Sequence, residues 1–438
     1  MSQASTWDGM SPQLRKVAER ARNEPDGRFH SLAHLIDEMA LARAFGRQRA
    51  NAAVGVDGIT KEMYEQDLQG NLKDLIERLK AKRYRHQPIR RVHIPKDNGK
   101  TRPLGISAFE DKVVQDAVRE VLQAVYEQDF LDCSHGFRPG RSAHDAIRAL
   151  NRSVDRGECN WILEADIVSF FDSVDRTALE EMLRKRLADG SLLRLIGKCL
   201  NVGVLDGAEF TTPDVGTAQG SILSPLLGNI YLHYALDEWF EREVRPRLRG
   251  RATLIRYADD LVIGFEYRED ADRVWEVLPK RMQRYGLTLH PDKTRLLDFR
   301  RPSAAQRDGT GPSTFDFLGF TLYWRRTLRG RWRVGCQTRR ARLHRAKSAV
   351  YEWCRDHRHH PLDVQHAGLR SRLQGHMNYF GVNGNLRRVA SLYAHAVRSW
   401  VKWVGRRSQR ARLTWERARL LLQRYPLPPP RIVVPIWG

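Results

Sequence analysis

The sequence predicts an α+β fold in which a small antiparallel sheet is surrounded by helices. Two short β-like runs, 252–256 and 261–265, flank the tetrad Tyr-Ala-Asp-Asp at 257–260 and predict a hairpin. A separate apolar run ends at Asp166 and predicts another strand. Elsewhere apolar residues recur at helical spacing. With 438 residues and 41% hydrophobic content, the chain can bury a core divided among two to four domains.

The elements before Asp166 follow from apolar periodicity and from turn residues. Residues 55–58, with two glycines around Val-Asp, predict a tight turn. The expected elements are, in order, helices within the first 60 residues, an amphipathic helix over 64–82, a β-hairpin over 90–106 and a helix over 111–126.

The elements after Asp166 are expected to be mostly helical outside the tetrad hairpin. A helix is expected over 177–188, with Thr177 and Glu180 as a capping box and Gly190 as its end. After Trp324 the chain is expected to remain mostly helical up to a proline-rich segment near the C-terminus, which cannot continue a helix.

The charge of the chain indicates a polyanionic partner. The formal net charge is +23, and residues 325–424 contain 25 Lys and Arg against 4 acidic residues. Such a density suits a phosphate-lined surface and says little about the fold.

Three further features bear on location. No apolar run approaches the ~20 residues needed to cross a bilayer. The N-terminus carries no apolar signal core after a basic segment. The five cysteines are scattered without a Cys-x-x-Cys pair, which argues against a zinc ribbon or a disulfide framework. These features predict a cytoplasmic protein without a membrane partner.

The acidic residues of the predicted strands point to metal-dependent chemistry. Asp259 and Asp260 are adjacent at a turn, where their charges repel, and a divalent cation would neutralise them. Asp166 places a third carboxylate at a strand end, and three such carboxylates are what a two-metal phosphoryl-transfer site requires. The pattern indicates a nucleic acid polymerase. The alternative is that these acids only cap helices or form turns, which is the role expected of Asp172 and Asp175.

A series of motifs runs along nearly the whole chain in a fixed order. After a block at 51–64 come seven motifs: Ile94-Pro95-Lys96 with 102–106, then 135–142, 166–172, 216–225, the tetrad at 257–260, 286–294 and 317–320. In their content and order these motifs resemble those of bacterial group II intron reverse transcriptase/maturase proteins, in which a block like 51–64 precedes the fingers.

The resemblance implies a right-hand polymerase with mostly helical fingers, an antiparallel palm sheet and a helical thumb. It divides the chain into an N-terminal extension with the start of the fingers at 1–85, fingers and palm at 86–325, a helical thumb or maturase domain at 326–405 and a basic C-terminal extension at 406–438. It also implies two Mg²⁺ ions, for which Mn²⁺ is a possible substitute, deoxynucleoside triphosphates, an RNA template, a DNA or RNA primer and intron RNA.

Site residues are assigned by matching positions to the family's motifs. The catalytic residues are Asp166, Asp259 and Asp260, and these three together with Ile167 form the metal site. The remaining assignments are Lys96, Arg102, Phe171, Gln219 and Lys293 for the nucleotide, and Tyr257, Arg138 and Arg141 for primer and template.

Plainer roles stay open for several of these side chains. The resemblance implies that Phe171 is the barrier to a 2′-hydroxyl. The alternative is that Phe171 packs in the hydrophobic core, since Phe170 beside it would point the other way on a strand. Tyr257 could belong to the hairpin core. Lys96 and Arg102 could lie on a solvated basic face, and Lys293 could neutralise local charge instead of donating a proton to pyrophosphate.

Two departures from the family pattern are visible. Ala218 stands where the family usually has proline before Gln219, which predicts a less rigid turn. The paired cysteines and the His-Asn-His pattern of the endonuclease domain that many relatives append are not found. In this respect the chain resembles the compact members of the family, such as those encoded by class C introns.

The function expected from the resemblance is RNA-directed DNA synthesis together with assistance to splicing and retrohoming of an intron. A domesticated relative that serves phage defence or DNA repair is one alternative. An RNA-binding splicing cofactor whose polymerase site is idle is another. The oligomeric state is left open, with a dimer possible.

Overall fold

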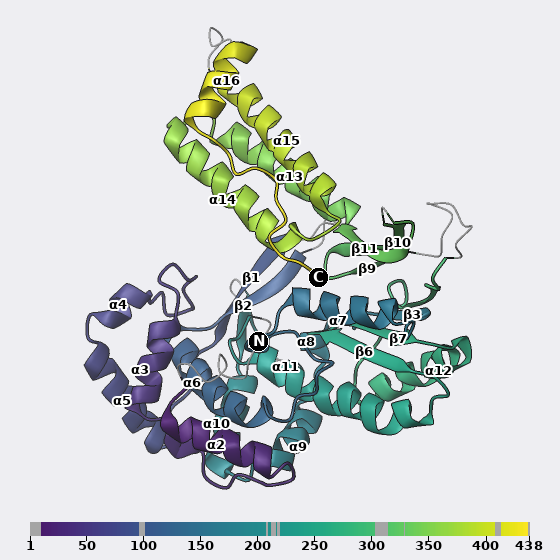
Figure 1. Cartoon of the computed structure of the whole chain (residues 1–438). Helices are drawn as coiled ribbons and strands as arrows, with labels where there is room; N and C mark the ends of the chain where they lie inside the picture. The colour runs from purple at the N-terminus through teal and green to yellow at the C-terminus, as the bar shows by residue number, and fades with distance from the viewer. Residues whose placement is uncertain are drawn as a thin grey trace.

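The computed structural model describes residues 10–95, 101–206, 209–211, 216, 220–302, 314–327, 329–407 and 413–436. It has a large lower body of helices packed around a four-stranded sheet, and a bundle of helices that stands away from this body (Figure 1). Helices and antiparallel sheets are both extensive, so the predicted α+β class is confirmed.

The N-terminal part of the body is a layer of helices on one long, buried helix. Helix α6 (Phe109–Tyr126) has 14 of its 18 residues buried, which makes it the centre of this part. The helices of the layer are α2 (Pro12–Asn23), α3 (Glu38–Arg47), α4 (Lys61–Glu65) and α5 (Leu68–Lys80). On α3, Arg47 pairs with Asp116 of α6 at 2.6 Å. The single helix expected over 64–82 is instead two, because the Asp67 side chain accepts the Gly70 N–H and starts α5.

The hairpin expected over 90–106 is confirmed. Strand β1 (Ile89–Pro95) pairs antiparallel with β2 (Thr101–Ile106), with Val92 opposite Leu104. Its other edge pairs with the short strands β4 (Val204–Asp206) and β5 (Glu209–Thr211), in the order β2-β1-β4-β5.

The central sheet has the order β6-β7-β3-β8 and is antiparallel throughout. Its strands are β3 (Trp161–Ala165), β6 (Ala252–Tyr257), β7 (Asp260–Phe265) and β8 (Arg295–Asp298). Strand residues alternate between two cores, as a period of two requires. Ile162 and Val262 pack in the cluster that contains α7 (Ala143–Asp155), whereas Leu163 and Ile263 pack in the cluster that contains α12 (Arg268–Arg284).

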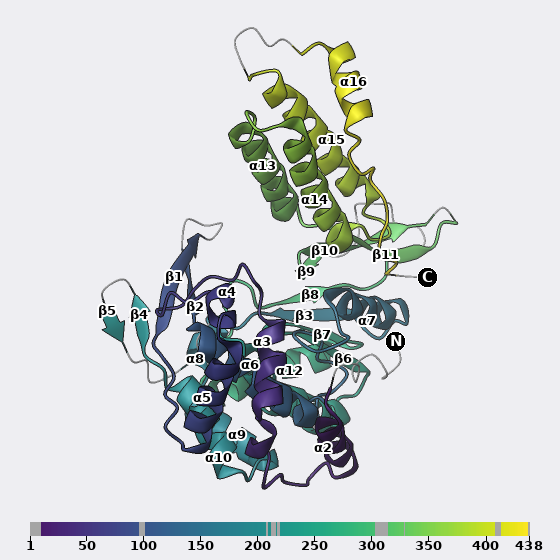
Figure 2. The same ribbon diagram turned by 90° about the vertical axis from the view of Figure 1, so that its left-hand side faces the viewer.

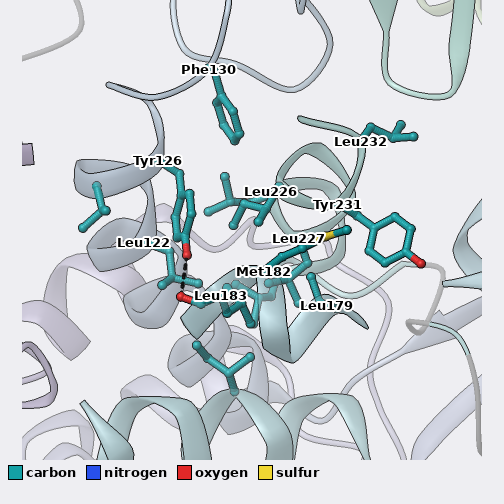
Figure 3. Packing of buried hydrophobic residues seen from close by; sticks show 14 of the residues in the cluster. Leu122, Tyr126, Phe130, Leu179, Met182, Leu183, Leu226, Leu227, Tyr231 and Leu232 are labelled. Carbon is teal, nitrogen blue, oxygen red and sulfur yellow. Dashed lines mark hydrogen bonds between the residues drawn. The ribbon is translucent and has the colours of Figure 1, made fainter. Parts of the chain in front are cut away.

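A group of helices connects the central sheet to α6. These are α8 (Phe170–Ser173), α9 (Arg176–Arg186), α10 (Gly190–Leu200) and α11 (Ser224–Leu232), which continues as π-helical turns η2 (His233–Asp237) and η3 (Phe240–Val244) and the 3-10 turn η4 (Arg245–Arg247). Figure 3 shows side chains of α6, α9 and α11 packed together, with the Tyr126 hydroxyl donating to the Leu183 carbonyl at 3.1 Å.

Two expectations about these helices are wrong in detail. The cap of α9 is Asp175, which accepts the Ala178 N–H, and the expected capping box of Thr177 lies inside the helix. Gly190 does not end a helix but begins α10, because Asp189 caps that helix by accepting two backbone N–H groups. The capping role expected of Asp175 is therefore confirmed, whereas the capping box expected of Thr177 is wrong.

The region after Trp324 begins with strands, so the expectation of helix from this point is wrong over 325–338. Strand β10 (Phe320–Arg326) pairs with β9 (Phe315–Phe317) and with β11 (Trp332–Thr338). In β11 the buried side chains Trp332, Val334, Cys336 and Thr338 lie at every second position, with Arg333, Gly335 and Gln337 between them. The short run with an arginine and a glycine inside it did not display this period of two clearly in the sequence.

The helical bundle follows this small sheet (Figure 2). It consists of α13 (Arg340–Asp356), α14 (Leu362–Phe380), α15 (Leu386–Val404) and α16 (Trp415–Arg424). The chain then returns along the bundle, where Val434 bridges Val382 and Val433 donates its N–H to the Gly381 carbonyl at 2.7 Å. Within the described ranges, no helix is both long and apolar enough to cross a membrane.

Candidate active site

The pairing of two strands brings the three predicted acids to one edge of the central sheet. Asp166 directly follows β3, whereas Asp259 and Asp260 lie where β7 begins. Strands β3 and β7 are antiparallel neighbours, with Ala165 opposite Leu261. One residue further along, this register places Asp166 beside Asp260.

The turn that carries Asp259 and Asp260 is tight and strained. Tyr257 is paired with Asp260, so only two residues close the hairpin. Ala258, the first of them, has φ 58°, in the left-handed region that a side chain with a Cβ rarely adopts. Such a residue persists only where the surrounding structure holds it.

A loop after α12 lies against the Asp166 strand end. The His290 N–H donates to the Asp166 carbonyl at 2.8 Å, and the Val168 N–H donates to the Thr288 carbonyl at 2.8 Å. This loop delivers Lys293, whose ammonium pairs directly with the Asp166 carboxylate. In this ion pair Lys293 neutralises local charge, which is the alternative role that the sequence left open for it.

The three carboxylates are electrostatically coupled. The pKa of Asp260 is raised to about 7, first by loss of hydration and then by the charges of Asp259 and Asp166, with Lys293 acting in the opposite direction. Because the Asp260 side chain remains exposed, we give the like-charge repulsion more weight than the loss of hydration. The site therefore holds more negative charge than its one lysine offsets.

The chemistry of this site fits a divalent cation that binds oxygen. Among the described residues, no group of three or more His, Cys, Asp or Glu side chains is close enough to hold a metal ion as the site stands. Carboxylate oxygens are nevertheless the ligands that Mg²⁺ prefers, and Asp166, Asp259 and Asp260 repel one another until a cation neutralises them. The Ile167 side chain is buried in the core, so only its main chain could contribute.

The predicted triphosphate ligands lie largely outside the described residues. Lys96 and Gln219 fall in segments that the structure does not describe. The main chain of Arg102 is opposite Ile94 in the β1–β2 hairpin, whereas its side chain is not described. Their assignment to the nucleotide stays a prediction.

Phe171 lies near the acids but not on a strand. Phe170 and Phe171 begin the short helix α8, so the argument that they point to opposite sides of a strand is wrong. Phe170 is buried, whereas Phe171 is half-buried and contacts the Phe170 ring edge-on at a centroid distance of 5.1 Å. Packing and a nucleotide contact are both compatible with this position.

Two arginines predicted to contact primer or template have internal partners. Arg138 is buried, pairs with Glu127 at 2.7 Å and donates to the Ser134 carbonyl at 3.0 Å. This guanidinium holds the loop together and is not presented to a nucleic acid, which corrects the prediction for Arg138. Arg141 is partly exposed and pairs with Asp132 at 2.6 Å, so its predicted contact stays a prediction.

Tyr257 is half-buried next to the acids, between the body and the bundle. Its ring lies 6.5 Å from that of Phe137, which is exposed. Burial raises the pKa of Tyr379 on α14 to about 12, with smaller contributions from Tyr257 and Asp260. The base of the bundle therefore lies close to the turn that carries the acids.

One functional residue was missed in the sequence. Arg256 interrupts the apolar strand just before the tetrad, and its side chain is completely buried beneath the turn. A charged residue inside an apolar strand was the available signal, because such a charge is buried only when it is paired.

Comparison with known proteins decides the family. The model of the family "Reverse transcriptase (RNA-dependent DNA polymerase)" matches residues 94–322, which is more than half of the chain. The chain belongs to the reverse transcriptase family. The matched segment of this reverse transcriptase contains the three acids, the loop of Lys293 and strand β2 of the β1–β2 hairpin.

Two of the three relatives of this reverse transcriptase described below carry the word intron in their names. It is 33% identical to Protein YkfC of Escherichia coli (strain K12) over 367 residues, which cover 74% of this chain and 91% of YkfC. It is 34% identical to the group II intron-encoded protein LtrA of Lactococcus lactis subsp. cremoris over 301 residues, 66% of this chain and 50% of LtrA. It therefore spans about half the length of LtrA. It is also 36% identical to Nuclear intron maturase 1, mitochondrial, of Arabidopsis thaliana over 92 residues, 21% of this chain and 13% of that protein. These matches confirm the predicted resemblance to group II intron reverse transcriptases.

Loss of the Lys293 charge is expected to tighten divalent-cation binding to the reverse transcriptase. In Lys293→Met no ammonium competes for Asp166, so Mn²⁺ affinity without substrate should rise roughly three- to tenfold, since a neighbouring unit charge is worth about 1 kcal/mol. Electron paramagnetic resonance of free Mn²⁺ measures this affinity.

Two control variants accompany this measurement. Lys293→Arg keeps the charge and should bind Mn²⁺ as the wild type does. Arg295→Met removes the charge that pairs with Glu164 at 2.8 Å on the neighbouring strands, and should change the affinity less. Unchanged or weaker Mn²⁺ binding in Lys293→Met would contradict the competition.

Proposed function

We propose that this reverse transcriptase extends a primer 3′-hydroxyl on an RNA template with deoxynucleoside triphosphates. The observation that carries this proposal is the meeting of Asp166, Asp259 and Asp260 at the paired ends of β3 and β7. Family membership supplies the reaction class, and the coupling of the three charges supports a cation-dependent site.

The proposed architecture is a right hand. The central sheet with its helices corresponds to the palm, the β1–β2 hairpin and the helices around α6 to the fingers, and the bundle to the thumb. We keep the proposed divisions at 1–85, 86–325, 326–405 and 406–438, with one refinement. Because β11 ends at Thr338, the helical part of the thumb begins at α13.

The proposed site holds two Mg²⁺ ions, and Mn²⁺ is a possible substitute. When bound, the metals would lower the pKa of the primer 3′-hydroxyl and stabilise charge on the leaving pyrophosphate. Asp166 and Asp259 would hold both ions, and Asp260 would help to hold the ion beside the primer. The main chain of Ile167 completes the proposed set. Lys293 would leave Asp166 and offset the charge of the triphosphate.

The remaining proposed roles surround this centre. Lys96 and Arg102 would bind the triphosphate, because a polyanion needs cations opposite the metals. Gln219 would contact the nucleotide, and Phe171 would exclude a 2′-hydroxyl. Tyr257, half-buried beside the acids, would pack against the primer backbone.

The bundle is suited to hold the nucleic acid. On α14, Leu369 and Leu373 are buried, whereas Arg370 and Arg372 are exposed. The apolar side of the helix packs in the bundle while its cations face solvent. One helix can therefore both stabilise the bundle and bind a nucleic acid. The names of the relatives, an intron-encoded protein and an intron maturase, support intron RNA as one partner and splicing assistance with retrohoming as the biological role.

Asp259→Asn is expected to abolish DNA synthesis while RNA binding persists. Losing a metal ligand removes several kcal/mol of transition-state stabilisation, so primer extension on an RNA template should fall about a hundredfold or more. Binding of the same RNA, measured by filter retention, should remain within a few-fold, because it depends on the basic bundle.

Asp298→Asn is the matched control, since Asp298 lies on the neighbouring strand β8 and pairs with Arg300 at the surface. It should retain primer extension. Normal DNA synthesis by Asp259→Asn would overturn the metal assignment, and retained splicing assistance in that variant would show that the two functions are separable.

Phe171→Ala is expected to relax discrimination against ribonucleotides. Without the ring, a 2′-hydroxyl meets no steric barrier, so the ratio of kcat/KM for ribonucleotide over deoxynucleotide should rise. Phe171→Tyr keeps the ring and should keep the preference. An unchanged ratio in Phe171→Ala would contradict the proposed barrier and favour a packing role for Phe171, such as its contact with Phe170.

A further inference from the structure

Arg256 uses all of its hydrogen-bond donors beneath the turn that carries the acids. Its side chain is 0% exposed. Two donors bind the Asp237 carboxylate, from Nε to Oδ1 at 2.8 Å and from Nη2 to Oδ2 at 2.6 Å. The other three bind Asn229 Oδ1 at 2.9 Å, Ser134 Oγ at 2.8 Å and the Ala258 carbonyl at 3.0 Å. A guanidinium has five N–H groups, and here each has an acceptor.

The acceptors come from separate parts of the chain. Asp237 is the last residue of the π-helical turn η2, Asn229 lies on α11 and Ser134 lies in the loop after α6. A π-helical turn often marks a functional position, because it displaces one residue from the regular helix. The guanidinium of Arg256 therefore joins the continuous helical segment of α11 and η2, and the loop after α6, to the left-handed residue Ala258.

The loop of Ser134 is itself fixed against the turn. Arg256 donates its N–H to the Cys133 carbonyl and accepts the His135 N–H, each at 2.8 Å. The Asn229 amide donates to the Gly136 carbonyl at 2.7 Å. A Cβ at Gly136 would lie 2.3 Å from the Ala258 nitrogen, so the loop touches the turn where only glycine fits.

Stability alone does not explain this network. Burying an ion pair costs hydration that the attraction barely offsets, and apolar residues of similar volume often stabilise a fold as well or better. What apolar residues cannot do is donate to the Ala258 carbonyl and hold its φ at 58°. The network thus specifies a geometry, and that geometry is the turn of Asp259 and Asp260.

We propose that Arg256, oriented by Asp237, Asn229 and Ser134, is a positioning residue that fixes the Ala258 turn and thereby sets Asp259 and Asp260 against Asp166. The inference rests on the proposed function of this site, since it assigns Arg256 to the reaction of the acids. Arg256 acts through the turn and does not touch substrate.

The test replaces the pair while keeping the packing. In the double variant Arg256→Met with Asp237→Leu, kcat for primer extension should fall roughly 10- to 100-fold, because displacement of a catalytic group by about 1 Å has a cost of that order. KM for the deoxynucleotide should stay within a few-fold. Mn²⁺ affinity without substrate should weaken, whereas the denaturation midpoint should be retained.

Arg256→Lys distinguishes the effect of the positive charge from the effect of the hydrogen-bond geometry. It also tests the proposal if the double variant does not fold. Lysine keeps the positive charge opposite Asp237 but cannot bind four partners in a planar fork. We expect kcat and Mn²⁺ affinity to fall in the same direction. Wild-type kcat in either folded variant would overturn the proposal.

Arg186 of α9 with Asp129, in the segment after α6, provides a matched buried pair. The two side chains are 3.0 Å apart and both are largely buried. Arg186→Met with Asp129→Leu should leave kcat per folded molecule unchanged. An equal fall of kcat in this control would show that loss of any buried ion pair loosens the protein and lowers its activity, and it would overturn the proposal. A wild-type protein without primer extension would instead contradict the proposed function.

Discussion

The antiparallel pairing of β3 with β7 determines where the three acids of the proposed active site lie. The pairing places the end of one strand beside the start of the other, so residues almost a hundred positions apart in the sequence share one edge of the sheet. Both faces of the sheet are covered by separate apolar cores, one with α7 and one with α12. A slip of one residue would turn every side chain to the wrong core, which fixes the register and with it the acids.

This arrangement concentrates negative charge, and two cationic side chains support it in different ways. Lys293 offsets part of the charge, and Arg256 holds the turn in place. Lys293 reaches Asp166 from a loop whose backbone is bonded to the same strand end. Beneath the turn, Arg256 is neutralised by Asp237, so that its donors can hold the Ala258 carbonyl. The first contact is exposed and can be displaced, whereas the second is fully buried. A site that must accept cations while keeping its shape needs both kinds of contact.

The basic bundle is attached close to this site by polar contacts. His144 of α7 bonds the Tyr379 carbonyl at 2.8 Å, and Asn385 accepts the Thr338 N–H at 2.9 Å between the bundle and its sheet. The returning C-terminal chain adds a bond from Arg148 to the Pro435 carbonyl at 3.1 Å. In the function that we propose, these contacts would let the cations of the bundle and the acids of the sheet act on one nucleic acid.

Local patterns predicted the parts of the fold that depend on local physics. The β1–β2 hairpin, the helix α6 and the tetrad hairpin follow from alternation, periodicity and turn residues, and the strand before Asp166 from its apolar run. Strand β11 was missed because Arg333, Gly335 and Gln337 separate its buried side chains. The cap of α9 was expected at Asp175, but a capping box was also expected at Thr177, because both residue types are good caps. The network of Arg256 depends on contacts between distant segments, which no single sequence reveals.

Anomalous diffraction from crystals grown with Mn²⁺, an RNA–DNA primer–template and an incoming deoxynucleotide tests the central claim most directly. We predict a manganese peak held by Asp166 and Asp259, with Lys293 released from Asp166 and Arg256 still bonded to the Ala258 carbonyl. A metal bound away from these acids, or a turn that changes conformation without Arg256 following it, would contradict the account.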